Sequence, residues 1–146
     1  MSSGSGSGGD VMTARVQPYS AVVLDHFAAP RNLGRLPDAN GHGVAGDLVT
    51  GATRIEIALR IAGGVVRDAR FRAIGCSATI AAASLATTLL IGRSADEAAA
   101  LTADALVAAL DGLPPERLYA PALVIEAITA ALAAWRSGAT GKEGIG

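Results

Sequence analysis

The clearest hydrophobic pattern in the chain is a strict alternation at residues 53–61, TRIEIALRI. Its apolar residues fall on one face: Ile55, Ile57, Leu59 and Ile61. Alternation of this kind is typical of a strand with one buried face. The segment 65–73, VVRDARFRA, also alternates. We expect the two segments to pair antiparallel through a three-residue loop at 62–64.

The register of this predicted hairpin follows from matching the apolar faces of its two strands. The expected pairs are Ile55 with Phe71, Ile57 with Ala69, Ile61 with Val65, Glu56 with Arg70, and Arg54 with Arg72. A slip by one residue would place apolar residues opposite charged ones, so that register is disfavoured. Continued to the open end of the hairpin, the expected register brings Thr50 across from Cys76.

Helical periodicity and boundary residues predict about five helices around the hairpin. They are a short helix capped by Ser20 and ended by Pro30, an apolar central helix at 77–91, a helix opened by the capping box Ser94–Glu97, one from Thr102 to Leu110, and one from Pro121 to about Ser137. Residues 31–52 hold five glycines and are expected to form a loop-rich connection. Two to three antiparallel strands packed against about five helices make an α+β domain.

Composition limits the size of the fold and the class of partner. A chain of 146 residues fits one domain, which we place at residues 19–137, with flexible tails at 1–18 and 138–146. Hydrophobic residues make up 51% of the chain, charged residues 17%, and the net charge is −1. These values argue against an intrinsically disordered chain and against a protein that binds nucleic acid electrostatically.

The same composition bears on compartment, membrane and catalysis. The single cysteine, Cys76, cannot form an internal disulfide and no signal segment is recognisable, so we expect a cytoplasmic protein. The uncharged stretch 73–92 has the length of a membrane span, but it continues a strand and contains five hydroxyl residues, so we expect no span. No Ser/His/Asp arrangement, phosphate-binding loop or dinucleotide fingerprint is present, so we expect no enzyme.

Three motifs in order resemble one known family. They are YSAVVLDHFAAPRNLG at 19–34, VVRDARFRAIGCSATIAAASLAT at 65–87, and GLPPERLY at 112–119. Over residues 19–137 the chain resembles the IscU/NifU-type iron–sulfur cluster scaffolds. The resemblance implies a protein that holds a nascent 2Fe-2S cluster, accepts sulfur from a cysteine desulfurase, and is recognised by an Hsp70-type chaperone.

The resemblance also implies where the cluster ligands would lie, and this chain departs from the family there. The family uses three cysteines, an aspartate and a nearby histidine. Aligned without gaps, the first cysteine falls on Thr50, the aspartate on Ala52 and the second cysteine on Cys76, while the His-Cys pair falls on Tyr119 and Ala120. Only Cys76 retains a family ligand.

Two further features of the alignment concern the aspartate and the chaperone. A gapped alternative aligns Ala45–Asp47 with the family's A-C-G-D turn and keeps an aspartate, but it restores no second thiolate. In the family's L-P-P-V-K motif, the match is Leu113, Pro114 and Pro115, whereas Glu116 and Arg117 replace Val and Lys. The chaperone motif is therefore only partly retained.

The ligand losses predict that one protomer does not hold a cluster, because iron–sulfur clusters are usually held by four ligands, mostly thiolates. We expect no cofactor, and an iron–sulfur cluster or iron only if a partner or a second protomer supplies ligands. His26 and His42 fall on no metal position of the family and are expected in surface or capping roles. Cys76 is either a small packing residue or a thiol whose pKa is lowered at a helix N-terminus, which would suit persulfide acceptance.

The function expected from these residues is protein–protein binding, in or derived from iron–sulfur cluster assembly. The partner would be a cysteine desulfurase, an Hsp70-type chaperone or a larger complex. The candidate contact residues are Leu113, Pro114, Pro115, Glu116, Arg117 and Tyr119, with an apolar patch expected from 50–52, 75–77 and 119–121. The alternative is a structural accessory subunit of another complex with no iron–sulfur role.

Overall fold

The computed structural model describes residues 19–47 and 49–138, so the predicted tails lie outside the described residues except for Gly138. Three antiparallel strands form one sheet in the order β1 (Gly41–Gly46), β2 (Arg54–Ala62) and β3 (Val65–Ile74). The helices are α2 (Ala21–Ala28), α3 (Ser77–Leu90), α4 (Ala95–Ala99), α5 (Ala103–Ala109) and α6 (Tyr119–Ser137), with a 3-10 turn η1 (Pro115–Arg117) before α6. This confirms the expected α+β fold.

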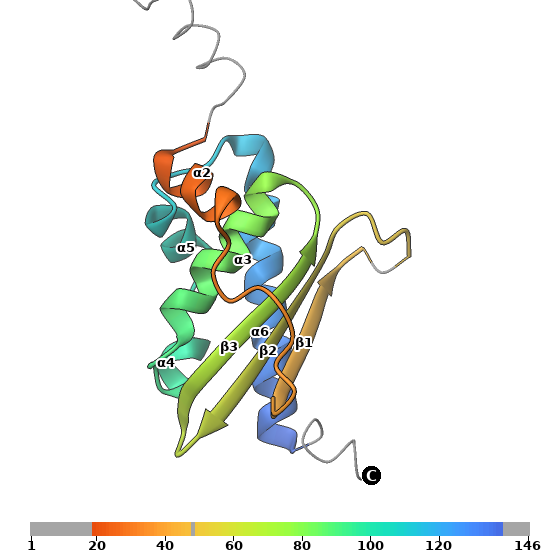
Figure 1. The fold of residues 1–146 in the computed structure, drawn as a ribbon, viewed down its shortest axis with the longest axis vertical. Helices are drawn as coiled ribbons and strands as arrows, with labels where there is room; N and C mark the ends of the chain where they lie inside the picture. Colours follow the sequence, from red (N-terminus) through yellow and green to blue (C-terminus); the bar gives the residue numbers. More distant parts are fainter. Residues whose placement is uncertain (1–18, 48, 139–146) are drawn as a thin grey trace, which may run out of the picture.

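One face of the sheet is covered by helices, α6 lying on β1 and β2 and α3 lying on β3 (Figure 1). The alternating residues of β2 point into this interface, where Ile55, Ile57 and Leu59 are fully buried and Ile61 is 4% exposed. The predicted pattern of faces is therefore confirmed. Most of the buried positions of α3 are alanines, which lets the helix lie close to the sheet and to α6.

The predicted hairpin register is wrong by two residues along most of its length. Ile55 pairs with Ala73, and Glu56 pairs with Arg72. The loop contains two residues, Gly63 and Gly64, both with positive φ, and opposite the step from Arg60 to Ile61 a bulge places one extra residue in β3. Along most of the hairpin this shifts the pairing by two residues, so the side chains from Asp68 to Ile74 keep their predicted faces. Next to the turn the predicted face is wrong, because Val66 and not Val65 is buried opposite Ile61.

The first strand, β1, lies inside the segment that we expected to be loop-rich. Its glycines suit this position because α6 crosses very close to the strand. A Cβ atom added to Gly43 would lie 2.2 Å from the Ala127 carbonyl oxygen and 2.4 Å from the Ala131 nitrogen. The glycines that lower strand propensity in the sequence thus permit the helix to approach the sheet.

Most helix boundaries follow the predicted capping residues. The Ser20 side chain accepts a hydrogen bond from the Val23 backbone N–H, and the Ser94–Glu97 capping box is present. The last helix begins at Tyr119 and not at Pro121 as we predicted. Proline is tolerated within this first turn because the first backbone N–H groups of a helix have no intrahelical partner.

The segment after α2 folds along the outer edge of β3. The Phe71 backbone N–H donates to the Asn32 carbonyl at 2.9 Å, and the Gly34 N–H donates to the Phe71 carbonyl at 2.8 Å. From there the chain crosses the face of the sheet that carries no helix (Figure 1). Within residues 19–47 and 49–138 the two sides of the sheet are therefore covered differently, one by helices and the other by this loop.

One helical stretch in the described part of the chain, Pro115–Ser137, is long and apolar enough to cross a membrane by length and composition alone. Its buried residues are Ala120, Pro121, Val124, Ala127, Ile128, Ala131 and Leu132. Since α6 packs on β1 and β2, the core of the fold accounts for this apolar composition. The uncharged stretch noted in the sequence divides between the end of β3 and α3.

Candidate functional site

Cys76 lies between β3 and α3, at the N-cap position of the helix. Gly75 makes the sharp connection with a φ of +156°, and a Cβ atom there would lie 3.1 Å from the Thr79 side chain. The Cys76 Sγ atom lies 3.1 Å from the Tyr119 hydroxyl and 3.5 Å from the Thr79 hydroxyl. The thiol is half-buried and has two hydroxyl neighbours.

These neighbours change the acidity of the thiol. Burial alone would raise the pKa of Cys76, but hydrogen bonds from the Tyr119 and Thr79 hydroxyls lower it. The backbone N–H groups of Thr79 and Ala78 in the first turn of α3 act in the same direction, and the net pKa lies below the usual cysteine value. The same contact with Cys76 raises the pKa of Tyr119. The arrangement therefore favours thiolate at Cys76 and a protonated tyrosine beside it.

The turn before α6 completes this end of the molecule. Arg117 Nε donates a hydrogen bond to the Tyr19 hydroxyl at 3.0 Å. Leu118 and Tyr119 are 45% and 41% exposed. We call Cys76, Leu118 and Tyr119 the thiol surface.

The remaining residues predicted for this end are separated from the thiol surface. Ala120 and Pro121 are buried, so of the segment 119–121 only Tyr119 is exposed. Among the motif residues Leu113 to Arg117, Pro115 and Glu116 are exposed and the other three are half-buried. The predicted apolar patch is thus smaller than expected, because the start of α6 points its small residues into the core.

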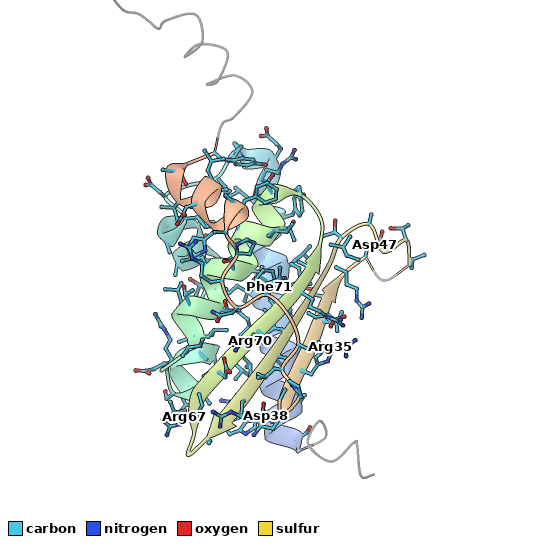
Figure 2. All side chains as sticks on the ribbon, in the orientation of Figure 1. Arg35, Asp38, Asp47, Arg67, Arg70 and Phe71 are labelled. Carbon is cyan, nitrogen blue, oxygen red and sulfur yellow. The ribbon has the colours of Figure 1, made fainter. Side chains whose placement is uncertain are left out.

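Thr50 and Ala52 lie on the exposed loop between β1 and β2. The Asp47 carboxylate organises this loop, accepting hydrogen bonds from the Val49 N–H at 3.0 Å, the Thr50 N–H at 3.1 Å and the Thr50 hydroxyl. Figure 2 shows Asp47 on this loop, which projects beyond the edge of the sheet. Within the described residues no hydrogen bond or ion pair joins the loop to Cys76. The prediction that Thr50 lies across from Cys76 is wrong, since the pairing of β2 with β3 ends at Arg54 and Ile74.

The donor atoms at the thiol surface do not fit an iron–sulfur cluster. Cys76 is the one thiol, and its polar side-chain neighbours are the hydroxyls of Tyr119 and Thr79. Across residues 19–47 and 49–138, no group of three or more His, Cys, Asp or Glu side chains is placed to hold a metal ion. Neutral hydroxyls are poor ligands for the soft sites in which clusters are bound.

The sequence of the chain matches the model of a known protein family. The family model of the NifU-like N-terminal domain matches residues 18–141. The chain belongs to this family. The match spans all of the described residues, which agrees with the resemblance seen in the three sequence motifs.

Relatives of this NifU-like chain include iron–sulfur cluster assembly scaffold proteins. The scaffold protein IscU 1 of Archaeoglobus fulgidus is 37% identical over 114 residues, covering 78% of this chain and 74% of that protein. The scaffold protein IscU of Escherichia coli is 37% identical over 123 residues, covering 82% of this chain and 94% of that protein. These identities therefore show that the chain is similar in sequence to iron–sulfur cluster assembly scaffold proteins.

Solved structures support the same fold for the NifU-like chain. A putative scaffold protein for the SUF system from Fervidobacterium islandicum aligns with a TM-score of 0.64 at 18% identity, covering 78% of this chain and 96% of that one. The N-terminal part of a NifU-like protein from Brucella abortus aligns with a TM-score of 0.51 at 21% identity, covering 84% and 83%. At these identities the likeness concerns the fold alone.

Two features of this NifU-like site were not predicted from the sequence. One is the direct contact between Cys76 and Tyr119, because the sequence pattern predicts only that the two residues lie at the same end of the sheet. The other is the role of Asp47 in holding the loop. The signal for Asp47 was present, since an aspartate three residues before a threonine in a glycine-rich loop favours a side-chain-to-backbone turn.

Proposed function

We propose that this chain acts in iron–sulfur cluster assembly as a scaffold-family protein that binds another protein through the thiol surface and holds no cluster by itself. The observation that carries the proposal is the position of Cys76, half-buried against the Tyr119 hydroxyl at the start of α3. A cysteine desulfurase is the partner that this site suits best, because thiolate is the form of cysteine that accepts sulfur from a persulfide. The chain itself would catalyse no reaction and would work in the cytoplasm.

The surroundings of Cys76 support protein binding more than metal binding. Tyrosine is enriched at protein interfaces because its ring buries a large area while its hydroxyl keeps a hydrogen bond. Tyr119 has this form, being 41% exposed with its hydroxyl 3.1 Å from Cys76 Sγ. Leu118 adds an exposed aliphatic side chain next to it in the chain. The altered motif from Leu113 to Arg117 makes an Hsp70-type chaperone a second choice of partner.

Cluster binding is tested by anaerobic reconstitution with iron and sulfide followed by desalting. We expect a colourless protein, because one thiolate per protomer is far from the usual four ligands. A visible absorption band retained with two irons per protomer or per dimer would overturn this part of the proposal. The E. coli relative treated in parallel shows that the reconstitution conditions work.

Partner binding is tested by titrating the chain against a cysteine desulfurase that carries a persulfide. Tyr119→Ala should weaken binding by about 2 kcal/mol or more, as truncation of a central interface residue does, while Cys76→Ser should cost less. Arg136→Ala, on the distant part of α6, is the matched control. Unchanged affinity of Tyr119→Ala together with a lower melting temperature would mean that Tyr119 only closes the fold. Wild-type protein that does not bind the desulfurase would favour a structural subunit without an iron–sulfur role.

A further inference from the structure

A cavity of about 210 Å³ opens on the face of the sheet that carries no helix. The loop from Gly34 to Ala39 forms one wall, and side chains of β1, β2 and β3 form the rest. Its apolar lining comes from Leu36, Pro37, Ala39 and Ala58. This cavity is separate from the thiol surface, which lies beyond the end of β3.

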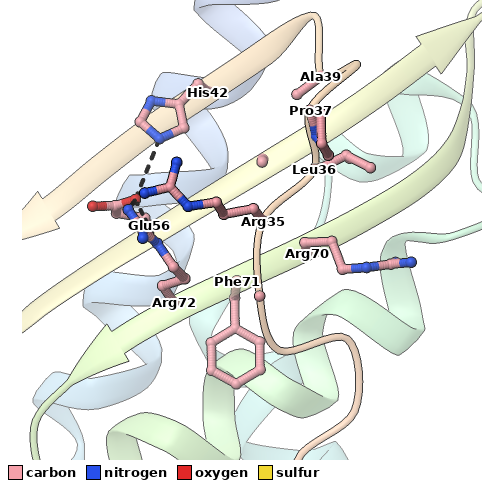
Figure 3. A pocket seen from close by; sticks show the side chains of 11 residues that line it. Arg35, Leu36, Pro37, Ala39, His42, Glu56, Arg70, Phe71 and Arg72 are labelled. Atoms are coloured by element: carbon pink, nitrogen blue, oxygen red, sulfur yellow. Dashed lines mark hydrogen bonds and ion pairs between the residues drawn. The ribbon is translucent and has the colours of Figure 1, made fainter.

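Positive charge surrounds the single carboxylate among the residues that line this cavity. The side chain of Glu56 is 14% exposed, and its oxygens lie 2.9 Å from Arg72, 3.0 Å from Arg54 and 3.5 Å from His42 Nε2. Figure 3 shows Arg35 reaching from the loop toward the same group, whereas Arg70 points to the other side of the loop. Three guanidinium groups therefore gather around one carboxylate.

Arg35 is the cation of this group that has no counterion. It is exposed, and within the described residues it makes no hydrogen bond or ion pair. The nearby acidic residues are engaged elsewhere, since Asp38 pairs with Arg60 at 3.4 Å and Asp68 pairs with Arg70. Glu56 carries one negative charge against Arg35 and Arg72 of the lining, with Arg54 paired to it from beside the cavity, so the cavity keeps a positive excess in a chain whose net charge is −1.

We propose that this cavity, the arginine pocket, binds an acidic segment of a partner protein. A carboxylate of the segment pairs with the guanidinium groups of Arg35 and Arg72, and the adjoining aliphatic carbons lie on Leu36, Pro37 and Ala58. Arginine suits this task because its planar group donates two parallel hydrogen bonds to one carboxylate. The proposal does not involve Cys76, and it does not depend on which partner binds the thiol surface.

The lining of the arginine pocket favours a protein carboxylate over other anions. An inorganic phosphate gains most where hydrogen-bond donors surround it, but one side of this pocket is aliphatic. A nucleic acid needs an extended basic surface, and the chain as a whole has a pI of about 6.1. An acidic side chain, with methylene groups next to its carboxylate, matches both parts of the lining. Leu33, 57% exposed on the same loop, extends the apolar area beside the pocket.

The test is fluorescence anisotropy with a short labelled peptide in which glutamates flank a central leucine. We expect binding that weakens as ionic strength rises, because the charges are exposed and screened by salt. Arg35→Gln should reduce the affinity about tenfold, the loss of one charged hydrogen-bonding group. This variant should fold like the wild type, because Arg35 has no partner to lose among the described residues. Arg136→Gln on α6 is the matched control and should bind like the wild type.

A second variant tests whether removing negative charge from the arginine pocket strengthens peptide binding. Glu56→Gln removes the only carboxylate of the pocket and should strengthen peptide binding, with amide signals of Ala58 and Phe71 shifting in an NMR titration. The same peptide with glutamine in place of glutamate should not bind. The proposal is overturned if the glutamate peptide fails to bind, if the glutamine peptide binds equally, or if Arg35→Gln binds like the wild type. It is equally overturned if inorganic phosphate or a short uridine oligonucleotide binds more tightly than the peptide.

Discussion

At the scale of single residues, the hydroxyl of Tyr119 is the strongest of the groups that lower the pKa of Cys76. It lies 3.1 Å from the sulfur and offsets the burial that would otherwise raise the thiol pKa. A cysteine that only packs in a core needs no such donor, and half-exposure is unusual for one. The two interpretations that the sequence left open, a packing residue and a functional thiol, therefore stay predictions that the acidity of Cys76 distinguishes.

Tyr119→Phe should raise the pKa of Cys76, because it removes the donor that stabilises thiolate and leaves the ring in place. The pH dependence of iodoacetamide alkylation measures this directly, and the midpoint should move to higher pH. Tyr19→Phe is the matched control, since the Tyr19 hydroxyl accepts from Arg117 and makes no contact with the thiol. An unchanged midpoint in Tyr119→Phe would show that the Thr79 hydroxyl and the helix N-terminus set the acidity of Cys76 without Tyr119.

At the scale of elements, two close contacts hold the helices to the rest of the fold. Helix α6 lies so near to β1 that Gly43 has no room for a side chain. Helix α2 is joined to α3 by a buried polar contact, in which His26 Nδ1 lies 2.8 Å from the Ser84 hydroxyl. The Arg31 backbone N–H donates to the same hydroxyl at 2.8 Å. Both contacts depend on the small residues of the helices and strands involved.

Gly43→Ala should destabilise the protein by about 1–3 kcal/mol, the usual cost of overpacking a tight interface. The added methyl group would meet the backbone of α6 at Ala127 and Ala131, which cannot move without shifting the helix. Urea unfolding followed by circular dichroism measures the change. His42→Ala, at the next residue on the exposed face, should change stability much less. Equal stability of Gly43→Ala and wild type would mean that α6 lies farther from β1.

Mild acid should loosen α2 through His26. Burial, and then the charge of Arg31, lower the pKa of His26, with Asp25 acting in the opposite direction. The folded protein therefore favours neutral imidazole, so its stability is unaffected by His26 above the ordinary pKa of 6.5 and falls as the pH drops below it. Unfolding measured between about pH 5 and 7 should show this decline. His26→Gln should flatten it and His42→Gln should not, whereas the same slope in His26→Gln would exclude His26 as the cause.

At the scale of the whole molecule, the sequence predicted the features that depend on local chemistry. Alternation in β2 and the capping residues Ser20 and Ser94 identified elements that the structure contains. The hairpin register was missed because it depends on Gly63 and Gly64 adopting positive φ and on a bulge, neither of which periodicity reveals. The strand β1 was missed because glycine lowers strand propensity, although the helix packed on it requires glycine.

In the candidate site, too, some features were predicted from the sequence and others were not. Cys76 and Tyr119 were placed at one end by their positions relative to β3 and α6, and they are in contact. Thr50 was misplaced because the path of an exposed loop is set by Asp47 and by the true register. The arginine pocket was not foreseen at all, since Arg35 and Arg72 are far apart in sequence and meet only because the loop after α2 crosses the open face of the sheet.

The domain boundary gives a prediction for the whole chain. A protein that starts at Tyr19 should unfold at the same temperature as the full chain, because residues 1–18 are rich in glycine and serine and offer little apolar surface to bury. Differential scanning calorimetry of the two forms checks this. A version that starts at Asp25 is the control, and it should be less stable because it lacks the buried Val23. A clear loss of stability on removing residues 1–18 alone would show that the domain begins before Tyr19.

The loop between β1 and β2 has a consequence for how this chain can change over evolutionary time. Thr50 and Ala52 are exposed, and the loop is held by hydrogen bonds to Asp47 and not by the core. A substitution at 52 therefore meets almost no folding penalty, and one at 50 loses only the hydrogen bonds of an exposed loop, so selection for stability constrains both positions weakly. Ala120, fully buried, is under the opposite constraint. A lineage released from cluster binding would lose its loop ligands by drift first, while its core and its family signature persisted.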